Sequence, residues 1–489
     1  MTRLLELIVA LVIVAVLALI VGVLLPSSGH IDRSTEVSKD IRHVYDVFDN
    51  FRRFPNYSGL RSFDPNAKYE QSNDKWYGPG SSISWTGNKE AGSGKLTIAS
   101  AEPDFDKVED AGEATIVWDL ENDWHGTNKH FTIKMKRTGR SQKLVKIDWA
   151  YDVHYGWNLV NRYSGLYING RPDTVIKYSL ENLENMLASI PNVDYSDLAP
   201  KIVDTPQQPV LLVSTTSKRN LTELDAASDS AMQRIQDAMK KLGVKQAGPR
   251  IRITTNYGDQ NYSFDVAVPI DTDTVKLDGK EYTFTVPDPS KAEAAAGASA
   301  AAGASAAADA SVAAAGSAGP AKAGSAGNSG DKEAGPKPGT LDEQGRLIID
   351  GKVRGLMAFG GKALEAVWYG SPAGVPATRK SLQAYAMTHG YPYNTTDAGM
   401  RMYDRQTRAE GSKNDDGDEV AYDEQAFKVY LPLKDSPEQT PEQAAGIDVE
   451  DPYAKSDDKD SDDGEPASAG TAPSVASSSA APAEAASAE

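Results

Sequence analysis

The sequence predicts an α+β protein with two folded regions behind a single membrane-spanning helix. Three observations lead to this prediction. An uncharged apolar stretch lies near the N-terminus, alternating strands lie between two amphipathic helices in residues 30–190, and a strand–helix–strand–strand pattern occurs in both residues 205–286 and residues 341–434. Apolar side chains recur every second residue in a half-buried strand and every three to four residues in a helix, so their spacing distinguishes the two.

The composition limits the classes of function. The chain has 489 residues, enough for two or three domains. It contains no cysteine, which excludes disulfides, thiolate zinc sites, iron–sulfur clusters and cysteine nucleophiles. Of the net charge of −18, residues 434–489 carry −11, from 14 acids and 3 bases. The rest of the chain is weakly acidic and lacks the basic face that nucleic-acid binding needs, so we expect no nucleic-acid partner.

The apolar stretch Leu7–Leu25 predicts an uncleaved membrane anchor. Its 19 residues would span about 28 Å as a helix, close to the hydrocarbon thickness of a bilayer. The stretch is longer than the apolar core of a signal peptide, and no small-x-small cleavage site follows Pro26. Arg3 favours a cytoplasmic N-terminus, while Arg33 and Lys39 oppose it. We expect a single-pass protein of a bacterial inner membrane with its body facing outward, and a body on the cytoplasmic face stays the alternative.

The region 30–190 predicts a sheet closed by a helix. A short strand, Ile31–Val37, leads into the amphipathic helix SKDIRHVYDVF, for which Ser38 is the expected N-cap. Strands with alternating apolar residues follow in TIVWDL, HFTIKMK and LVKIDWAYDV. The segment SLENLENMLASI predicts the last helix, which Pro191 ends. Such a sheet buries its apolar face by curling around that helix.

This element order and several motifs resemble the START-like superfamily that includes the polyketide cyclases (SRPBCC). The motifs are IDRSTEVSKDIRHVYDVFDNFRRFPNY, DPNAKYE, WYGPGSSISWTGNKEAGSGKLTI and YSLENLENML. The resemblance implies a helix-grip fold that holds a hydrophobic ligand, or lipid, between the sheet and the closing helix. A minority of members catalyse cyclisation or hydrolysis, but no catalytic motif of theirs matches residues of this chain.

Aromatic residues are concentrated in the same region. It contains six of the seven tryptophans, and aromatic rings on a curved sheet can line a cavity for an apolar ligand. The alternative is that these rings fill the core. The candidate ligand-binding residues of this region are Trp85, Trp118, Trp149 and Tyr151.

Residues 205–286 and 341–434 share one pattern. The first opens with the strand Val210–Thr215 and the second with Gly355–Gly361. Each half then has a helix ended by a glycine, a strand that carries a tyrosine, and a last strand, FDVAVPI or FKVYLPL. Matching features in matching order indicate a duplication whose halves pack together. The predicted architecture is therefore a duplicated strand–helix–strand–strand domain.

This duplicated unit resembles the gyrase-inhibitor-like (GyrI-like) small-molecule-binding domain. The resemblance implies a ligand groove between the halves, lined by aromatic side chains and an acid. Tyr403 and Asp404 match the tyrosine–acid step, with aspartate in place of glutamate. Trp368 and Tyr369 are the expected flat walls. An aromatic wall beside a carboxylate favours lipophilic cations, which are the expected ligands of this groove.

Two further segments have the composition of flexible chain. Residues 287–340 are rich in Ala, Gly and Ser, and residues 435–489 are acidic and then rich in Ala and Ser. We expect both to be disordered. The predicted organisation is an N-terminal tail 1–6, an anchor 7–25, a START-like domain 30–190, a linker 191–204, a first half 205–286, a linker 287–340, a second half 341–434 and a tail 435–489.

Enzyme signatures are mostly absent from the sequence. The six histidines form no metal-binding pair, and no nucleophile elbow, P-loop or dinucleotide-binding motif occurs. We therefore expect no metal and no cofactor, and no catalytic residue is assigned. The leading interpretation is a membrane-tethered protein that binds small apolar or amphipathic molecules. A cyclase-like or hydrolase-like enzyme, and an envelope interaction protein with vestigial pockets, stay open as alternatives.

Overall fold

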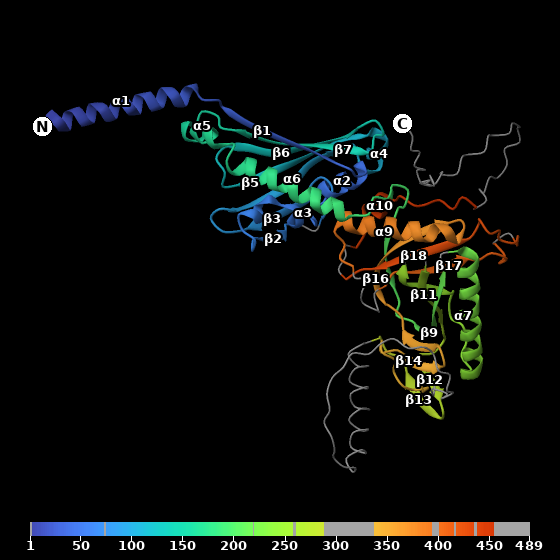
Figure 1. Ribbon diagram of the computed structural model, residues 1–489. Helices are drawn as coiled ribbons and strands as arrows, with labels where there is room; N and C mark the ends of the chain where they lie inside the picture. Colours follow the sequence, from blue (N-terminus) through green and yellow to red (C-terminus); the bar gives the residue numbers. More distant parts are fainter. Residues whose placement is uncertain are drawn as a thin grey trace, which may run out of the picture. The chain divides into compact units, whose positions relative to one another are not determined.

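The computed structural model describes residues 2–72, 75–218, 220–257, 261–287, 337–393, 401–414, 417–434 and 438–453. The helices and strands in these ranges belong to one unit, Met1–Glu450 (Figure 1). Most of the linker 287–340 and of the tail 435–489 lies outside the described residues, so the expected disorder of these segments stays a prediction.

The N-terminal helix α1, Thr2–Leu24, includes most of the predicted anchor. Its residues Arg3–Leu24 are long and apolar enough to cross a membrane. Nearly all of its described side chains are exposed. A helix that is apolar on every side normally has an apolar environment, either a protein core or lipid.

The first region, residues 30–190, contains a seven-stranded antiparallel sheet with the strand order β1-β7-β6-β5-β4-β3-β2. The strands are β1 (Ser28–Val37), β2 (Lys68–Gln71), β3 (Ser82–Thr86), β4 (Ser93–Glu102), β5 (Glu113–Asn122), β6 (Thr127–Thr138) and β7 (Leu144–His154). The helices are α2 (Ile41–Phe48), α3 (Phe54–Tyr57), η1 (Gly59–Ser62), η2 (Phe105–Lys107), α4 (Val108–Ala111), α5 (Leu159–Ser164), η3 (Gly165–Tyr167) and α6 (Arg171–Ser189). The long helix α6 packs on β1, α3 and η1. The expected order of strand, helices, antiparallel sheet and closing helix is confirmed.

The second region contains a nine-stranded sheet with the order β14-β15-β9-β11-β10-β17-β18-β16-β8. Its strands are β8 (Lys201–Thr205), β9 (Pro209–Lys218), β10 (Ile251–Tyr257), β11 (Asn261–Pro269), β14 (Leu347–Asp350), β15 (Val353–Met357), β16 (Gly361–Tyr369), β17 (Tyr403–Arg408) and β18 (Ala426–Pro432). The remaining elements are α7 (Leu221–Leu242), η4 (Pro372–Gly374), α9 (Val375–His389), α10 (Pro441–Ala445) and the hairpin β12 (Thr274–Leu277) and β13 (Lys280–Thr283). The α+β class expected from the sequence is confirmed.

The six central strands of this sheet are arranged symmetrically. From the middle outward the order is β10, β11 and β9 on one side and β17, β18 and β16 on the other. The chain connects them as β9-α7-β10-β11 and as β16-α9-β17-β18, so each side has the order strand, helix, strand, strand. The two sides meet where β10 pairs with β17.

One predicted strand of the second half differs from the structure. The strand that leads into α9 is β16, whereas the predicted opening strand Gly355–Gly361 overlaps β15, which pairs with β9 at the far side of the sheet. The acid Glu365 interrupts the apolar pattern of β16 in the sequence. In the structure its carboxylate accepts a hydrogen bond from the Lys428 ammonium at 3.1 Å, which allows the acid to lie within a strand.

The structured part of the chain also extends beyond Lys434. Residues 438–453 were expected to begin a disordered tail, but they include helix α10, which Thr440 caps through a capping box with Gln443. Glu442 in this helix is buried. Its carboxylate accepts hydrogen bonds from Arg42 of α2 and Tyr385 of α9, so α10 lies against both regions.

Candidate functional site

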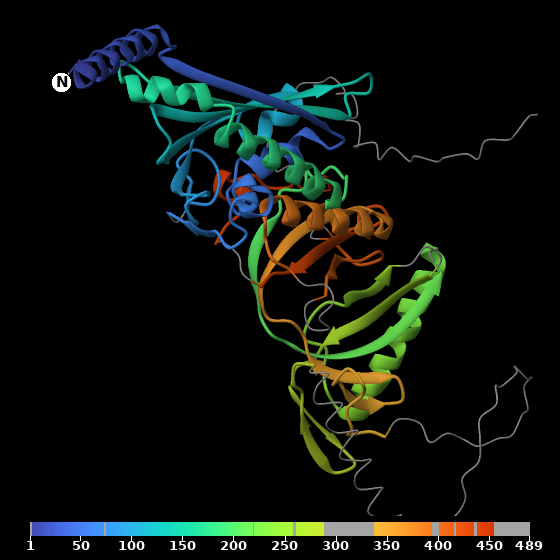
Figure 2. The same cartoon turned by 60° about the vertical axis from the view of Figure 1, so that its left-hand side comes forward.

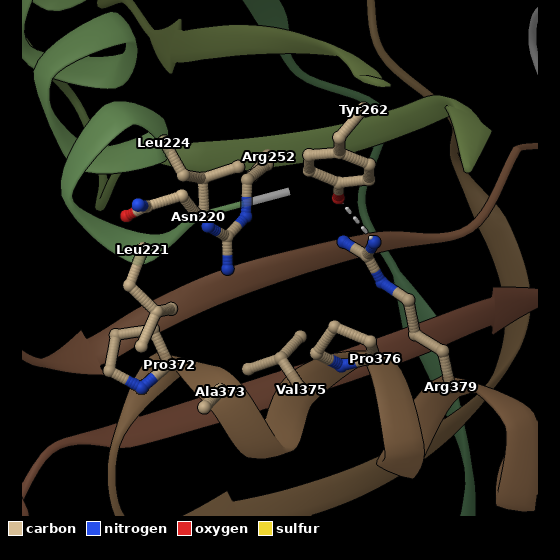
Figure 3. Close-up of a pocket in the computed structure, with 10 residues that line it drawn as sticks. All are labelled: Asn220, Leu221, Leu224, Arg252, Tyr262, Pro372, Ala373, Val375, Pro376 and Arg379. Carbon is tan, nitrogen blue, oxygen red and sulfur yellow. Dashed lines mark hydrogen bonds between the residues drawn. The ribbon is translucent and has the colours of Figure 1, made fainter. Parts of the chain in front are cut away.

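A cavity of about 190 Å³ lies where the two symmetric sides of the second sheet meet their helices. It is bordered by the N-terminal turn of α7 and by η4 with the N-terminal turn of α9 (Figure 3). The lining residues are Asn220, Leu221, Leu224, Arg252, Tyr262, Pro372, Ala373, Val375, Pro376 and Arg379. Each side of the sheet therefore contributes part of the wall.

The local sequence explains why two helices begin at this cavity. Asn220 caps α7, because its side-chain oxygen accepts a hydrogen bond from the backbone N–H of Thr222 at 2.9 Å. Proline in the first turn of α9 fixes the backbone where no intrahelical donor is required. Helix N-termini carry partial positive charge and unpaired N–H groups, so both helices favour negative charge in the cavity.

Two guanidinium groups point into the cavity from opposite sides (Figure 3). Arg252 comes from β10 and Arg379 from α9, and Arg379 is only 6% exposed. The hydroxyl of Tyr262 accepts a hydrogen bond from Nη1 of Arg379 at 2.7 Å. Nε of Arg379 is buried and has no hydrogen-bond partner among the described residues. The cavity therefore combines apolar walls with two strong cationic donors.

Both guanidinium groups share a single carboxylate. Asp404 is 2% exposed and forms ion pairs with Arg379 and, at 3.3 Å, with Nε of Arg252. Burial alone would lower the pKa of Arg252, but the attraction of Asp404 raises it above the ordinary value. Asp225 also lies within electrostatic range of Arg252, and burial raises the pKa of its carboxyl. Two cations therefore line the cavity, while the paired acid lies behind them.

The predicted groove residues have different positions from those expected. Asp404 is already paired with two arginines, so its charge is not available to a lipophilic cation. Tyr403 is buried and stacks on Tyr430 of the neighbouring strand, with ring centroids 4.7 Å apart. Neither residue is among those that line the cavity.

The two predicted aromatic walls also lie outside this cavity. The indole Nε1 of Trp368 donates a hydrogen bond to the Ser371 carbonyl at 2.8 Å, and its ring lies against Gly374. A Cβ atom added to Gly374 would lie 2.0 Å from that ring. Trp368 therefore supports the start of α9. Tyr369 lines a separate cavity of about 310 Å³ with Glu365 and Lys428.

Three of the four candidates in the first region belong to its packed core. Trp118 and Trp149 are fully buried, and their ring centroids lie 5.5 Å apart. Trp85 is 4% exposed, and its Nε1 donates to the Ala91 carbonyl at 3.2 Å. Only Tyr151 among the four lines a described cavity. This cavity of about 420 Å³ also includes Trp124.

Arg252, Tyr262 and Arg379 are the residues of the site that the sequence patterns did not identify. They lie on β10, β11 and α9, more than 100 residues apart at the extremes, and the β10–β17 pairing places Arg252 directly opposite Asp404. The sequence contains one usable signal. The strands predicted around Tyr257 and Tyr403 contain an arginine, Arg252, and an acid, Asp404, and antiparallel pairing of such strands can bring opposite charges together.

The described residues contain no cluster of three or more His, Cys, Asp or Glu side chains with the spacing of a metal site. The cavity lining contains neither a carboxylate nor an imidazole. Its polar groups are guanidinium, phenol and amide, which bind and orient a ligand.

Comparisons with known proteins give partial likenesses only. No family model and no curated protein matches the chain. Norcoclaurine synthase from Thalictrum flavum, in complex with dopamine and hydroxybenzaldehyde, is 16% identical, with a TM-score of 0.24 over 32% of this chain and 87% of that chain. A hypothetical protein from Helicobacter pylori is 9% identical, with a TM-score of 0.23 over 32% of this chain and 86% of that chain. The C-terminal domain of EcmrR is 7% identical, with a TM-score of 0.27 over 48% of this chain and 98% of that chain.

Proposed function

We propose that this protein is a membrane-anchored binding protein for a small amphipathic molecule that carries an anionic group. The ligand site is the cavity between α7 and α9, and α1 is the anchor. The observation that carries the proposal is the pair of guanidinium groups, Arg252 and Arg379, which line one cavity and, within the described ranges, share the single carboxylate of Asp404.

The charge balance favours an anion. Among the described residues, Asp404 is the carboxylate in ion-pair contact with the two guanidinium groups, while Asp225 acts on Arg252 without an ion-pair contact. The N-terminal ends of α7 and α9 add further positive potential. An anionic group in the cavity would accept charge-assisted hydrogen bonds, including one from the unpartnered Nε of Arg379. The apolar side chains of Leu221, Leu224 and Val375 would surround the remainder of the ligand.

The symmetric strand order supports the duplicated, GyrI-like interpretation of the second region. In that interpretation the ligand lies at the contact between the halves, and each half supplies one helix N-terminus to it. The first region keeps the START-like interpretation, because its antiparallel sheet is closed by α6. The proposed ligand differs from the sequence-based expectation in one respect, since it is an anion in place of a cation.

The test compares ligands that differ in charge alone. Naphthoate, neutral naphthamide and cationic naphthylmethylammonium are titrated against the detergent-solubilised full chain and against Arg379→Gln. We expect naphthoate to bind most tightly, and Arg379→Gln to weaken it by roughly tenfold or more, the value of a charged hydrogen bond of about 1.5–3 kcal/mol. Arg140→Gln is the matched control, because it removes the same charge from an exposed position in the first region.

Two outcomes would contradict the proposal. Equal affinity for the three compounds would show that charge has no role in the site. Equal loss of naphthoate binding in Arg379→Gln and Arg140→Gln would show that the ligand responds to net charge and not to this cavity.

A further inference from the structure

A segment of the first region lies against the end of the membrane-spanning helix. It runs from Trp157 to Tyr167 and includes α5 and η3 (Figure 2). Helix α5 contacts α1, and both views of the molecule show α5 beside the C-terminal end of α1 (Figures 1 and 2). We call residues 157–167 the anchor-side segment.

Specific hydrogen bonds fix this segment to α1. Nη1 of Arg162 donates to the carbonyl oxygens of Val23 and Leu25, at 2.8 and 3.1 Å. These are carbonyls at the C-terminus of α1, where intrahelical donors are lacking and a cation is favourable. The hydroxyl of Tyr163 donates to the carbonyl of Ala18. Gly22 allows the close approach, because a Cβ atom there would lie 3.1 Å from the Tyr163 ring.

These contacts set the depth of the segment along α1. Ala18 lies six residues before the end of α1 at Leu24, which corresponds to about 9 Å along the helix axis. If α1 spans a bilayer with Leu24 at one boundary, the side chain of Tyr163 reaches about this far below the boundary. Interfacial helices lie at a depth of about 5–10 Å.

The outer surface of the segment is apolar. The side chains that face away from the body are large and mostly exposed: Trp157 (82%), Val160 (68%), Leu166 (60%) and Tyr167 (79%). Residues 156–170 contain a single charged residue, Arg162, which is buried and already bound to α1. Trp and Tyr are the residues enriched at membrane–water interfaces.

A cavity opens beside this surface. It has a volume of about 420 Å³, and its lining includes Tyr167, Ile168, Trp124 and, from β7, Tyr151. The ionisable residues Asp123, His125 and Arg171 line it as well. Tyr167 therefore belongs both to the exposed apolar surface and to the rim of the cavity.

We propose that the anchor-side segment is a bilayer-contact surface, which holds the first region on the membrane with the mouth of its cavity at the lipid interface. The segment contacts the lipid leaflet in which α1 ends, at the level of the headgroups and the first part of the acyl chains. This inference rests on the anchoring part of the proposed function and is independent of the anion site. The contact of the segment with α1 and the lack of an exposed charged residue within 157–167 favour lipid over a protein partner. The ionisable residues Asp123, His125 and Arg171 of the adjoining cavity would lie at the headgroup level.

The natural absence of cysteine makes a direct test possible. Three single-cysteine variants of the full chain, Leu166→Cys, Val14→Cys and Ser141→Cys, are labelled with an environment-sensitive fluorophore and placed in lipid nanodiscs. Val14 lies in α1, and Ser141 is exposed in the turn between β6 and β7, at the opposite end of β7 from the segment. Fluorescence is measured with and without lipids that carry a nitroxide quencher on the acyl chain.

We expect the label at Val14 to lose most of its fluorescence to a mid-chain nitroxide. The label at Leu166 should be quenched by a nitroxide near the headgroup end of the chain, and the label at Ser141 by neither. Quenching at Val14 without quenching at Leu166 would overturn the docking surface and leave the anchor intact. No quenching at Val14 would overturn the anchor and the docking surface together. A label at Leu166 that is shielded from aqueous iodide but not quenched by lipid would place a protein on the surface, a second copy included, and would also overturn the inference.

Discussion

At the scale of single residues, Asp404 illustrates how a partner changes the chemistry of a side chain. In the sequence, Asp404 follows Tyr403, and this tyrosine–acid step predicts a site for a cation. In the structure it is the shared counter-ion of Arg252 and Arg379. The same charge therefore contributes to stability and partly compensates the cationic groups that face the cavity.

Replacing Asp404 with asparagine should lower stability and strengthen anion binding together. Breaking a buried ion pair costs about 3–5 kcal/mol, because the remaining charge is uncompensated. Naphthoate should supply the missing negative charge, so it should raise the melting temperature of Asp404→Asn by more than that of the wild type. Asp448→Asn is the control, because Asp448 pairs with Lys201 at an exposed position. A smaller rise in Asp404→Asn than in the wild type would contradict the anion site.

Asp49 provides a pH-dependent prediction. It is 7% exposed, and its Oδ1 atom has no hydrogen-bond partner among the described residues. Burial, and then the nearby charge of Asp46, raise the pKa of the Asp49 carboxyl well above its ordinary value of 3.8, while Lys75 and Arg42 act in the opposite direction. The folded state therefore holds this proton more tightly than the unfolded chain does, and stability is lost as pH rises from 3.8 towards the folded-state pKa.

Replacing Asp49 with asparagine should remove this loss. We expect the gain in melting temperature from Asp49→Asn to be larger at pH 8 than at pH 4. Asp106→Asn, at an exposed position, should change neither value. Thermal denaturation at the two pH values is the measurement, and an equal gain at both would mean that ionisation of Asp49 does not oppose folding.

At the scale of elements, the start of α9 determines the shape of the candidate site. Helix α9 carries three residues that line the cavity, Val375, Pro376 and Arg379. The turn η4, which leads into α9, packs against the Trp368 ring. The close contact between this ring and Gly374 leaves no room for a side chain. Packing of a single ring therefore positions one wall of the cavity.

Gly374→Ala should destabilise the protein by about 1–3 kcal/mol, the typical cost of overpacking. It should also weaken naphthoate binding, because the first turn of α9 has to move. The control introduces Gly374→Ala into the Trp368→Ala variant, in which the ring is absent and the added methyl group has space. If Gly374→Ala costs as much in the Trp368→Ala background as in the wild type, the contact with Trp368 is not the cause. Denaturant unfolding of the wild type, the two single variants and the double variant measures this coupling.

At the scale of the whole molecule, a buried polar cluster joins α2 to α9 and α10. Arg42 contacts Asp46 at 2.8 Å and Glu442 at 2.9 Å, and the Tyr195 hydroxyl donates to Asp46 at 2.8 Å. Burial alone would lower the pKa of Arg42, but Asp46 and Glu442 raise it. Burial, followed by Glu442, raises the pKa of the Tyr385 hydroxyl far above its usual range. The two regions therefore share one buried core.

Removal of α10 should destabilise the whole chain. A chain that ends at Lys434 would leave Arg42 with Asp46 alone, and we expect a loss of about 3–5 kcal/mol for the broken buried pair. Glu442→Gln should show a loss of the same sign. The control chain ends at Tyr453 and keeps every described contact. Full stability of the shorter chain in denaturant unfolding would show that α10 contributes nothing to the fold.

The sequence alone determined the α+β class and the order of elements in the first region. The spacing of apolar residues in LVKIDWAYDV and SLENLENMLASI predicted a strand and a helix that the structure contains as β7 and α6. The glycine after each helix predicted where α7 and α9 end, because Gly243 and Gly390 adopt the left-handed conformation. These features depend on residues close in the chain, so local spacing is sufficient to detect them.

Only the tertiary structure decided the partners of the charged residues. Local sequence could not show that Asp404 lies between Arg252 and Arg379, that Glu365 pairs with Lys428, or that Glu442 is buried against Arg42. A charged side chain is buried at low cost when a counter-ion pairs with it. Its burial can therefore be predicted only after that counter-ion has been identified. For the same reason, the sequence pattern places residues 438–453 in an acidic tail, although they include α10. It likewise gives no sign that the partners of Asp404 are two arginines of this chain.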